Sequence, residues 1–261
     1  MRLIALTLLV VFAAAASLVV VRSDAGYAAQ DRNHIAEGTT SKHWVGTDEL
    51  GRDRGIRICV ALLVGIAGAI SASVLGTVIS AAFGVTAAFA SPGAASILMY
   101  IRDVFLTLPW LFLLMMVRSA LPLTLAPWQS AGVTFLLLAL LGWPAYAGVS
   151  YARAVAVRNA EWLMYARAGG LRTSQIARHH VLPHLLPLLL SQFLIYIPAC
   201  LVAEANLGTL GLGISEPLPS WGSMLLSLGN TAVLAGSAWV YLPIVLLVTV
   251  LLLLELLVFE V

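Results

Sequence analysis

The segment MYARAGGLRTSQIARHHVLPHLLP, residues 164–187, is a short basic stretch in a chain that is otherwise strongly apolar. Residues 134–163 before it carry two arginines and one glutamate, and residues 185–203 carry no charged side chain. Two adjacent glycines interrupt its helix-forming residues, and a proline follows. We expect so polar and broken a segment to lie outside the membrane.

Composition places the chain among membrane proteins. Of 261 residues, 61% are hydrophobic and only 10% are charged, against about 25% charged residues in soluble domains. The net charge of +2 is too small to indicate nucleic-acid binding. Cys59 and Cys200 lie in apolar runs without the spacing of a metal or redox pair, so we expect two buried, inert thiols.

The sequence lacks a phosphate-binding P-loop. Its only lysine, Lys42, follows Glu-Gly-Thr-Thr-Ser and not the Gly-x-x-x-x-Gly that such a loop requires. We therefore expect no ATP binding by that route. Separately, the sequence offers no candidate cofactor site and no candidate catalytic residue.

Charge-free runs predict an all-α, polytopic membrane protein with about six transmembrane helices. The expected spans fall at 3–21, within 58–91, at 98–117, within 119–152, at 185–205 and at 234–256. A cleaved signal peptide is the alternative for the first, but its 19 apolar residues exceed the usual core of about 7–15. The runs 58–91 and 119–152 would each extend about 50 Å as a helix. Part of each should therefore lie along the membrane surface or turn back.

Charge density predicts the orientation. Residues 151–184 hold five arginines and a single acid, Glu161, whereas the six bases of 22–57 are balanced by six acids. By the positive-inside rule, 151–184 and both termini are expected in the cytoplasm. The predicted organisation is an N-terminal anchor with an outward-facing loop (1–57), then a membrane core (58–261) with a second outward-facing loop at 206–232.

The quoted segment is predicted to form two short helices. Alanines and arginines favour a helix over 151–168, which Gly169 and Gly170 end. Thr173 or Ser174 should cap a second helix that runs to Pro183. An ordinary basic loop held by lipid phosphates is the alternative interpretation.

The segment resembles the "EAA" loop of binding-protein-dependent ABC transporter permeases, whose pattern is Glu-Ala-Ala, three residues, Gly, and later Ile-x-Leu-Pro. Tyr165 and Ala166 take the two alanine places, Gly170 falls at the glycine, and Leu182-Pro183 close the pattern, while Met164 replaces the glutamate. The resemblance implies a coupling helix that docks on a separate ATPase subunit. The residues that it assigns to ATPase coupling are Met164, Tyr165, Ala166, Arg167, Gly170, Leu171 and Arg172.

Three further stretches narrow the resemblance to the second, C-type permeases of peptide and nickel importers. They are HWVGTDELGRD at 43–53, GWPAY at 142–146 and AEANLGTLGLGISEPLPSWGSML at 203–225. The four stretches occur in the family's order and cover roughly 40–260. The implied fold is that of a type I ABC importer permease.

The third stretch contains the candidate residues of a translocation path or outer loop: Glu204, Gly211, Gly213 and Trp221. An acid in a membrane span is functional by default, so Glu204 is expected to line the path or to pair with an arginine such as Arg118. A water-exposed helix end is the alternative. The loop itself is expected at the membrane interface, where Trp221 would suit, or, from the resemblance, at the path or the binding-protein surface.

Other polar residues are expected to be structural. Arg102 and Asp103 should form an interfacial pair. His179, His180 and His184 have no accompanying carboxylate and lie in the predicted cytoplasmic loop, so we expect no metal site there.

The resemblance implies a non-catalytic permease subunit in the inner membrane of a prokaryote, importing peptides or related small solutes, with nickel as an open alternative. Its implied partners are a sister permease, two ATP-binding subunits and an extracytoplasmic substrate-binding protein, without nucleic acid. Two alternatives stay open. The first is a self-sufficient channel or proton-coupled carrier, which would need more ionisable residues in its spans. The second is a transport-inactive scaffold, which the replacement of the motif glutamate by Met164 leaves open.

Overall fold

The computed structural model describes residues 2–23, 26–122, 125–161, 163, 165, 169–226 and 241–258. This part of the chain is helical, with one isolated β-bridge between Thr47 and Asp53 and no strand. The helices are α1 (Arg2–Arg22), α2 (Arg54–Phe89), α3 (Pro92–Thr107), α4 (Trp110–Ser119), α5 (Pro127–Arg158), α7 (Thr173–Ile176), the π-helix η1 (Ala177–Val181), α8 (Leu182–Thr209), α9 (Trp221–Leu226) and α11 (Leu242–Val258).

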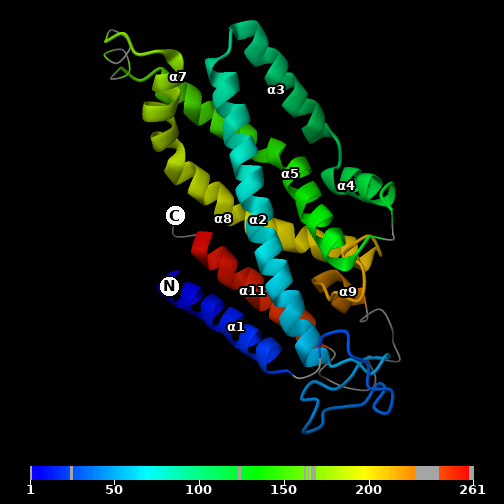
Figure 1. Cartoon of the computed structure of the whole chain (residues 1–261). Helices are drawn as coiled ribbons and strands as arrows, with labels where there is room; N and C mark the ends of the chain where they lie inside the picture. Colours follow the sequence, from blue (N-terminus) through cyan, green and yellow to red (C-terminus); the bar gives the residue numbers. More distant parts are fainter. Residues whose placement is uncertain are drawn as a thin grey trace.

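The helices form an elongated bundle with two distinct ends (Figure 1). At one, here called the α7 end, lie α7, the end of α2 and the start of α3. At the other, the α9 end, lie α9, the loop 26–53 and the start of α2. Helices α1 and α11 run side by side along one flank, and α3 and α4 occupy the other.

Helix α2 is the long axis of the bundle. Asp53 caps its first turn by accepting the Ile56 N–H (3.0 Å), and the helix continues for 36 residues, about 54 Å. It packs most extensively against α5 and α8. The turning back expected of 58–91 and 119–152 does not occur within α2 or the 32-residue α5, because each is one continuous helix. That part of each run lies along the membrane surface stays a prediction.

The third predicted span is not one straight helix. Helices α3 and α4 meet at a bend of 79° around Leu108 and Pro109. Proline lacks the N–H of a helical hydrogen bond, and here the break turns the chain sharply, so 98–117 forms a broken or re-entrant span.

Apolar helices of membrane-spanning length fit the predicted class. Within the described residues, α1, α2, α5 and the continuous stretch Thr173–Thr209 are long and apolar enough to cross a bilayer, and the bent pair α3–α4 makes a fifth candidate. Helix α11 is apolar but only 17 residues long, and the first part of the predicted sixth span, 234–240, lies outside the described residues. The total of six spans stays a prediction.

The main apolar core lies where α2, α5 and α8 cross. Tyr196 of α8 is 4% exposed, and its hydroxyl donates to the Leu138 carbonyl of α5 (2.9 Å). A Cβ atom added to Gly76 of α2 or Gly142 of α5 would lie 2.1 Å from the Tyr196 side chain. The two glycines therefore allow three helices to close around one aromatic ring.

Candidate functional site

The helix predicted over 151–168, which leads into the basic segment at the α7 end, ends ten residues earlier than predicted. Helix α5 ends at Arg158 and not at 168, because the chain turns at Asn159 and Ala160 before a short helical stretch. Tyr165 in that stretch is 80% exposed, and its carbonyl accepts the Gly169 N–H (2.9 Å). Met164, Ala166 and Arg167 lie outside the described residues.

Gly170 makes the turn that the double glycine predicts. Its φ of +80° lies in the left-handed region that favours glycine, and no atom lies within 4 Å of a Cβ added there. Leu171 and Arg172 follow on the surface. The segment thus presents an open, solvent-facing turn whose backbone conformation depends on Gly170.

Two details of the second short helix differ from prediction. The N-cap is Arg172 and not Thr173 or Ser174, and the Gln175 amide oxygen accepts the Arg172 N–H (2.8 Å). The helix does not end at Pro183, because α7 continues through η1 into α8 as one stretch from Thr173 to Thr209. Pro183 falls in the first turn of α8, where the missing N–H is tolerated after the wider turn of η1.

A second apolar core fastens this segment to the bundle; we call it the segment core. It gathers the ends of α2 and α5, the short helical stretch, α7, η1 and α8, and its members are Ala88, Ala154, Val157, Leu163, Ile176, Val181 and Leu185. Leu163, Val181 and Leu185 are fully buried. Arg158 adds a polar tie by donating to the Ala88 carbonyl. Packing therefore joins the exposed turn to the ends of three long helices.

Of the histidines beside this core, His179 and His184 are exposed and His180 is half-buried. His179 Nδ1 lies 3.1 Å from the Gln175 carbonyl, and His184 Nδ1 lies 2.7 Å from the His180 carbonyl. Across the described residues, no three potential metal ligands come together. On the opposite flank, Arg102 and Asp103 form the predicted pair, with Nη2 and Oδ1 3.3 Å apart.

Toward the α9 end, Glu204 is completely buried, so the water-exposed helix end is wrong. Neither carboxylate oxygen has a hydrogen-bond partner within the described residues by distance and angle, although Ser220 and the N–H groups of Trp221 and Gly222 lie around the carboxyl group. Trp221 is also fully buried, against Gly65, so its ring faces the protein interior. The interfacial depth of the loop stays a prediction. Residues 210–226, the described part of the loop that the sequence predicts to face outward and here called the outer loop, fold back over the end of α8 and remove both side chains from solvent.

Arg118 does not pair with Glu204. Its Nη2 donates to Ser130 Oγ (2.6 Å) and to the Gly213 carbonyl (3.1 Å). Arg118 is 2% exposed, so it ties α4 to α5 and to the outer loop from inside the protein. The sequence did not single out Ser130, and a serine in an apolar span offers little signal.

Glycines allow the outer loop to approach α8 closely. A Cβ atom on Gly222 would lie 2.3 Å from the Gly208 Cα, and one on Gly213 would lie 2.6 Å from the same atom. Gly211 has a φ of +74° and open space around it. Of these, Gly211 and Gly213 were candidates from sequence, whereas the Gly208–Gly222 contact was missed.

The stretch HWVGTDELGRD at 43–53 has a local structural role in this chain: its contacts fold the loop 26–53. His43 Nδ1 lies 2.8 Å from Asp53 Oδ2, and Gly46 and Gly51 take positive φ. Arg57 Nη2 donates to both Glu216 carboxylate oxygens (2.9 and 3.1 Å), joining this region to the outer loop. Nothing in the sequence marked Glu216 as the partner.

One carboxyl group in the loop 26–53 has a strongly altered acidity. A hydrogen bond from His34, followed by one from Lys42, lowers the pKa of Asp31 to about 2. The His34 Nδ1 and Lys42 Nζ atoms lie 2.9 and 3.1 Å from Asp31 Oδ2. Asp31 therefore keeps its charge over the physiological range.

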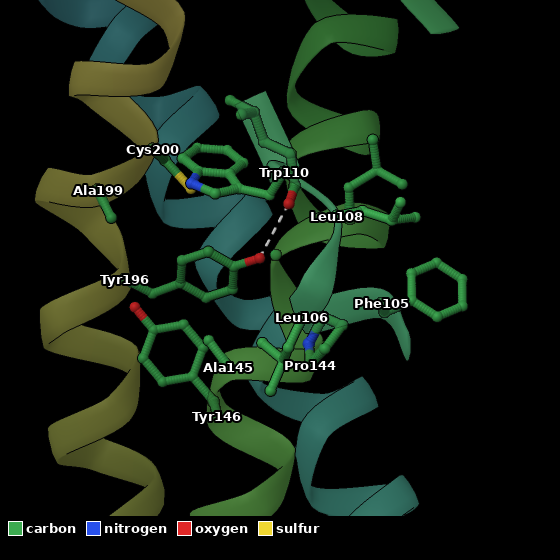
Figure 2. A pocket seen from close by; sticks show the side chains of 13 residues that line it. Phe105, Leu106, Leu108, Trp110, Pro144, Ala145, Tyr146, Tyr196, Ala199 and Cys200 are labelled. Carbon is green, nitrogen blue, oxygen red and sulfur yellow. Dashed lines mark hydrogen bonds between the residues drawn. The ribbon is translucent and has the colours of Figure 1, made fainter. Parts of the chain in front are cut away.

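A cavity of about 200 Å³ opens at the break between α3 and α4. Leu108 and Trp110 line it at the bend, and Tyr146 and Tyr196 line it from α5 and α8, with ring centroids 4.7 Å apart (Figure 2). Non-helical backbone is tolerated at membrane depth where it lines a cavity or is buried in protein. The bend lines such a cavity through Leu108 and Trp110.

Comparison with known proteins places these features in context. Residues 80–259 match the family described as "Binding-protein-dependent transport system inner membrane component". A putative peptide permease protein of Brucella suis is 32% identical over 203 residues, 77% of this chain and 65% of the relative. The dipeptide transport system permease protein DppC of Bacillus subtilis is 29% identical over 200 residues, 77% of this chain and 60% of the relative.

A glutathione transport system permease protein of Pectobacterium atrosepticum is 28% identical over 221 residues, 85% of this chain and 71% of the relative. The chain spans a little under two thirds of the length of the Brucella and Bacillus relatives.

Proposed function

Because the chain belongs to the family of binding-protein-dependent transport system inner membrane components, we propose that it is a non-catalytic permease subunit of an ABC importer. It forms half of a translocation path for peptides or related small solutes. The relatives named as peptide, dipeptide and glutathione permeases support this substrate class. Nickel, from the sequence resemblance, is the less supported cargo.

The segment at the α7 end is the proposed coupling element. The observation that carries the proposal is that an exposed turn at Gly170 is continuous with the fully buried segment core. A soluble ATPase can grip such a turn, and a rigid lever behind it can convert ATPase closure into helix movement. Met164, Tyr165, Ala166, Arg167, Gly170, Leu171 and Arg172 are the proposed contact residues.

The complete importer would contain a sister permease, two ATP-binding subunits and an extracytoplasmic substrate-binding protein, in the inner membrane of a prokaryote. In this assembly 1–57 is the N-terminal anchor with its outward loop, 58–261 is the permease core, 151–184 faces the cytoplasm and 206–232 faces outward. Cysteines introduced at the exposed Thr39 and Arg172 should differ in labelling by an impermeant reagent in intact cells. Equal labelling would reject this orientation.

Glu204 and the outer loop residues Gly211, Gly213 and Trp221 are proposed to belong to the translocation path or its outer closure. The support is a fully buried acid in a span, next to a loop that folds over it. Glu204→Gln keeps the shape of the side chain, so loss of transport at normal protein level would assign the role to the acid itself. Normal transport would leave Glu204 outside the path.

The coupling role is tested by Gly170→Asp in the complex purified through a tag on this chain and reconstituted in vesicles. A side chain at φ +80° costs about 1–2 kcal/mol, and it projects from the turn into open space. We expect transport to fall to background while the complex still binds ATP. Transport at the normal rate would reject this segment as the coupling element.

Gly170→Asn separates backbone strain from docking, because asparagine tolerates the left-handed conformation better than other residues with a side chain. If the turn meets the ATPase, Asn should also impair transport; if only backbone strain matters, it should rescue it. Gly93→Asp, at a helix start with open space around it, is the control for an added charge.

A self-sufficient, ion-driven carrier is less favoured by the described spans. Asp103 pairs with Arg102, and Glu255 lies exposed on α11. Glu204 alone is a fully buried acid in the described helices. The same preparation discriminates: transport in vesicles without ATP and with a proton gradient would support the carrier.

A further inference from the structure

A groove of about 660 Å³ lies between α1, α2 and α11 at the α9 end. Figure 1 shows the end of α1 and the starts of α2 and α11 side by side there, next to the loop 26–53. Each helix contributes apolar side chains to the walls: Leu18, Val19, Ile58, Cys59, Leu242 and Leu246. Leu18 and Val19 are about half exposed, so this apolar surface is left uncovered by the described chain.

Two cations stand at the polar mouth of the groove. Arg22 ends α1, and Lys42 comes from the loop 26–53; both line the groove and both are exposed. Arg22 makes no hydrogen bond or ion pair within the described part of the chain. Lys42 contacts Asp31 in an exposed pair, and such pairs are weak enough to exchange partners.

The acid of the groove is already committed. Asp53 Oδ1 accepts the Ile56 N–H at the start of α2, and Asp53 Oδ2 lies 2.8 Å from His43. Asp31 balances Lys42 in its exposed pair, so Arg22 is the cation of the mouth that no described acid contacts, and Lys42 joins it when that pair exchanges.

The depth of these groups matches a phospholipid. Helix α1 has 21 residues, enough to cross the hydrocarbon layer, so Arg22 at its end lies at headgroup level. Trp44 beside the mouth is 79% exposed, which is the usual situation of tryptophan at a membrane interface. Arginine and lysine side chains at that depth can form charge-assisted hydrogen bonds with a lipid phosphate.

We propose that this groove binds one anionic phospholipid, with its phosphate between Arg22 and Lys42 and an acyl chain against α1, α2 and α11. The lipid would fill the space between α1 and the bundle. This site is independent of the proposed transport function, because it requires neither the ATPase nor a substrate.

Lipid binding is measured by native mass spectrometry of the intact chain or its complex, titrated with phosphatidylglycerol or phosphatidylcholine. We expect one retained phosphatidylglycerol, and weaker phosphatidylcholine binding. The double change Arg22→Gln with Lys42→Gln should weaken phosphatidylglycerol by about fivefold for each cation, and leave phosphatidylcholine unchanged. Arg32→Gln, in the same loop but outside the groove, is the control and should behave as wild type.

Cys59 supplies an independent probe within the groove. Cys200 is 1% exposed whereas Cys59 is half-buried, so a Cys200→Ala background leaves Cys59 as the single reactive thiol. Alkylation of Cys59 should slow in phosphatidylglycerol nanodiscs relative to phosphatidylcholine nanodiscs, and this difference should vanish in the double variant.

Equal binding of both lipids, or a Cys59 rate independent of headgroup, would overturn the proposal. So would a loss in Arg32→Gln as large as in the double variant, since the effect would then be a general response to net charge. Each result stands whether or not the chain transports peptides.

Discussion

Removing one buried side chain from the segment core should loosen the proposed coupling element without disturbing the rest of the bundle. Ile176 is 3% exposed and packs in that core. Ile176→Ala deletes three carbon atoms, and about 0.8 kcal/mol per methylene gives a transfer loss of about 2.4 kcal/mol. The cavity left behind raises the expected loss into the range of about 2–5 kcal/mol.

A loss of 2.4 kcal/mol shifts the equilibrium between the packed and released segment by about 60-fold. Hydrogen exchange in the reconstituted complex reads this directly, because the Ile176 N–H donates to the Arg172 carbonyl (3.0 Å) and is protected while the helix start is formed. We expect exchange across 172–181 to accelerate by about that factor. Solute transported per ATP hydrolysed should fall in parallel.

Leu186→Ala is the matched control, because it removes the same number of carbon atoms from a side chain that is 53% exposed. It should change exchange across 172–181 very little. An unchanged rate in Ile176→Ala, or equal acceleration in both variants, would refute the idea that the segment core holds the turn.

Three further predictions concern the α9 end. Gly222→Ala should lower the midpoint of thermal unfolding in detergent, because its Cβ would lie 2.3 Å from backbone and overpacking costs about 1–3 kcal/mol. Gly93→Ala, in open space, should leave the midpoint unchanged, and equal midpoints in the two variants would contradict the close contact. The lowered pKa of Asp31 gives the loop 26–53 a contribution to stability that is complete above about pH 4 and is lost as the pH falls toward 2. Trp44 fluorescence should follow this change, and persistence of the acid transition in Asp31→Asn would contradict it. Arg57→Gln should make the loop 26–53 more sensitive to limited proteolysis, because Arg57 is 3% exposed and bridges to Glu216. Since the Glu216 side chain is half-exposed, the loss of stability should be limited to about 1 kcal/mol. Digestion at the wild-type rate would reject a stabilising role for the bridge.

The helical spans were largely predictable because lipid selects them by composition. Charge-free runs placed the first helix at 3–21, and α1 covers Arg2–Arg22. The double glycine likewise predicted the turn at Gly170, since a positive φ is a local property of the backbone.

The elbow at Pro109 was not predictable from its proline alone. Pro144, Pro187 and Pro198 lie inside α5 and α8 without ending them, because neighbouring groups in a packed bundle can satisfy the freed backbone. Whether a proline bends a span therefore depends on tertiary packing that the sequence does not display.

The interior placement of Glu204 and Trp221 was also beyond local reasoning. Both lie near glycines, prolines and polar residues, a composition that favours an exposed loop. Their burial results from the close approach of Gly208 to Gly222, a contact between residues of two different elements. Such a contact leaves no periodic signal in the sequence.

The packing around Tyr196 restricts how the bundle can transmit a movement. The ring fills the space between Gly76 and Gly142, so sliding of α2, α5 and α8 past one another would have to displace it. The segment core joins the same helices at the α7 end, and α8 then extends for 28 residues, about 42 Å, to the Gly208–Gly222 contact. A displacement imposed on the turn at Gly170 would thus reach the outer loop as a movement of one body. Relative motion is left to α3, because it has no buried residue and meets α4, which Arg118 ties to α5, at a sharp bend beside a cavity. The elbow, and not the central helices, is therefore where this fold can change shape at least cost in packing.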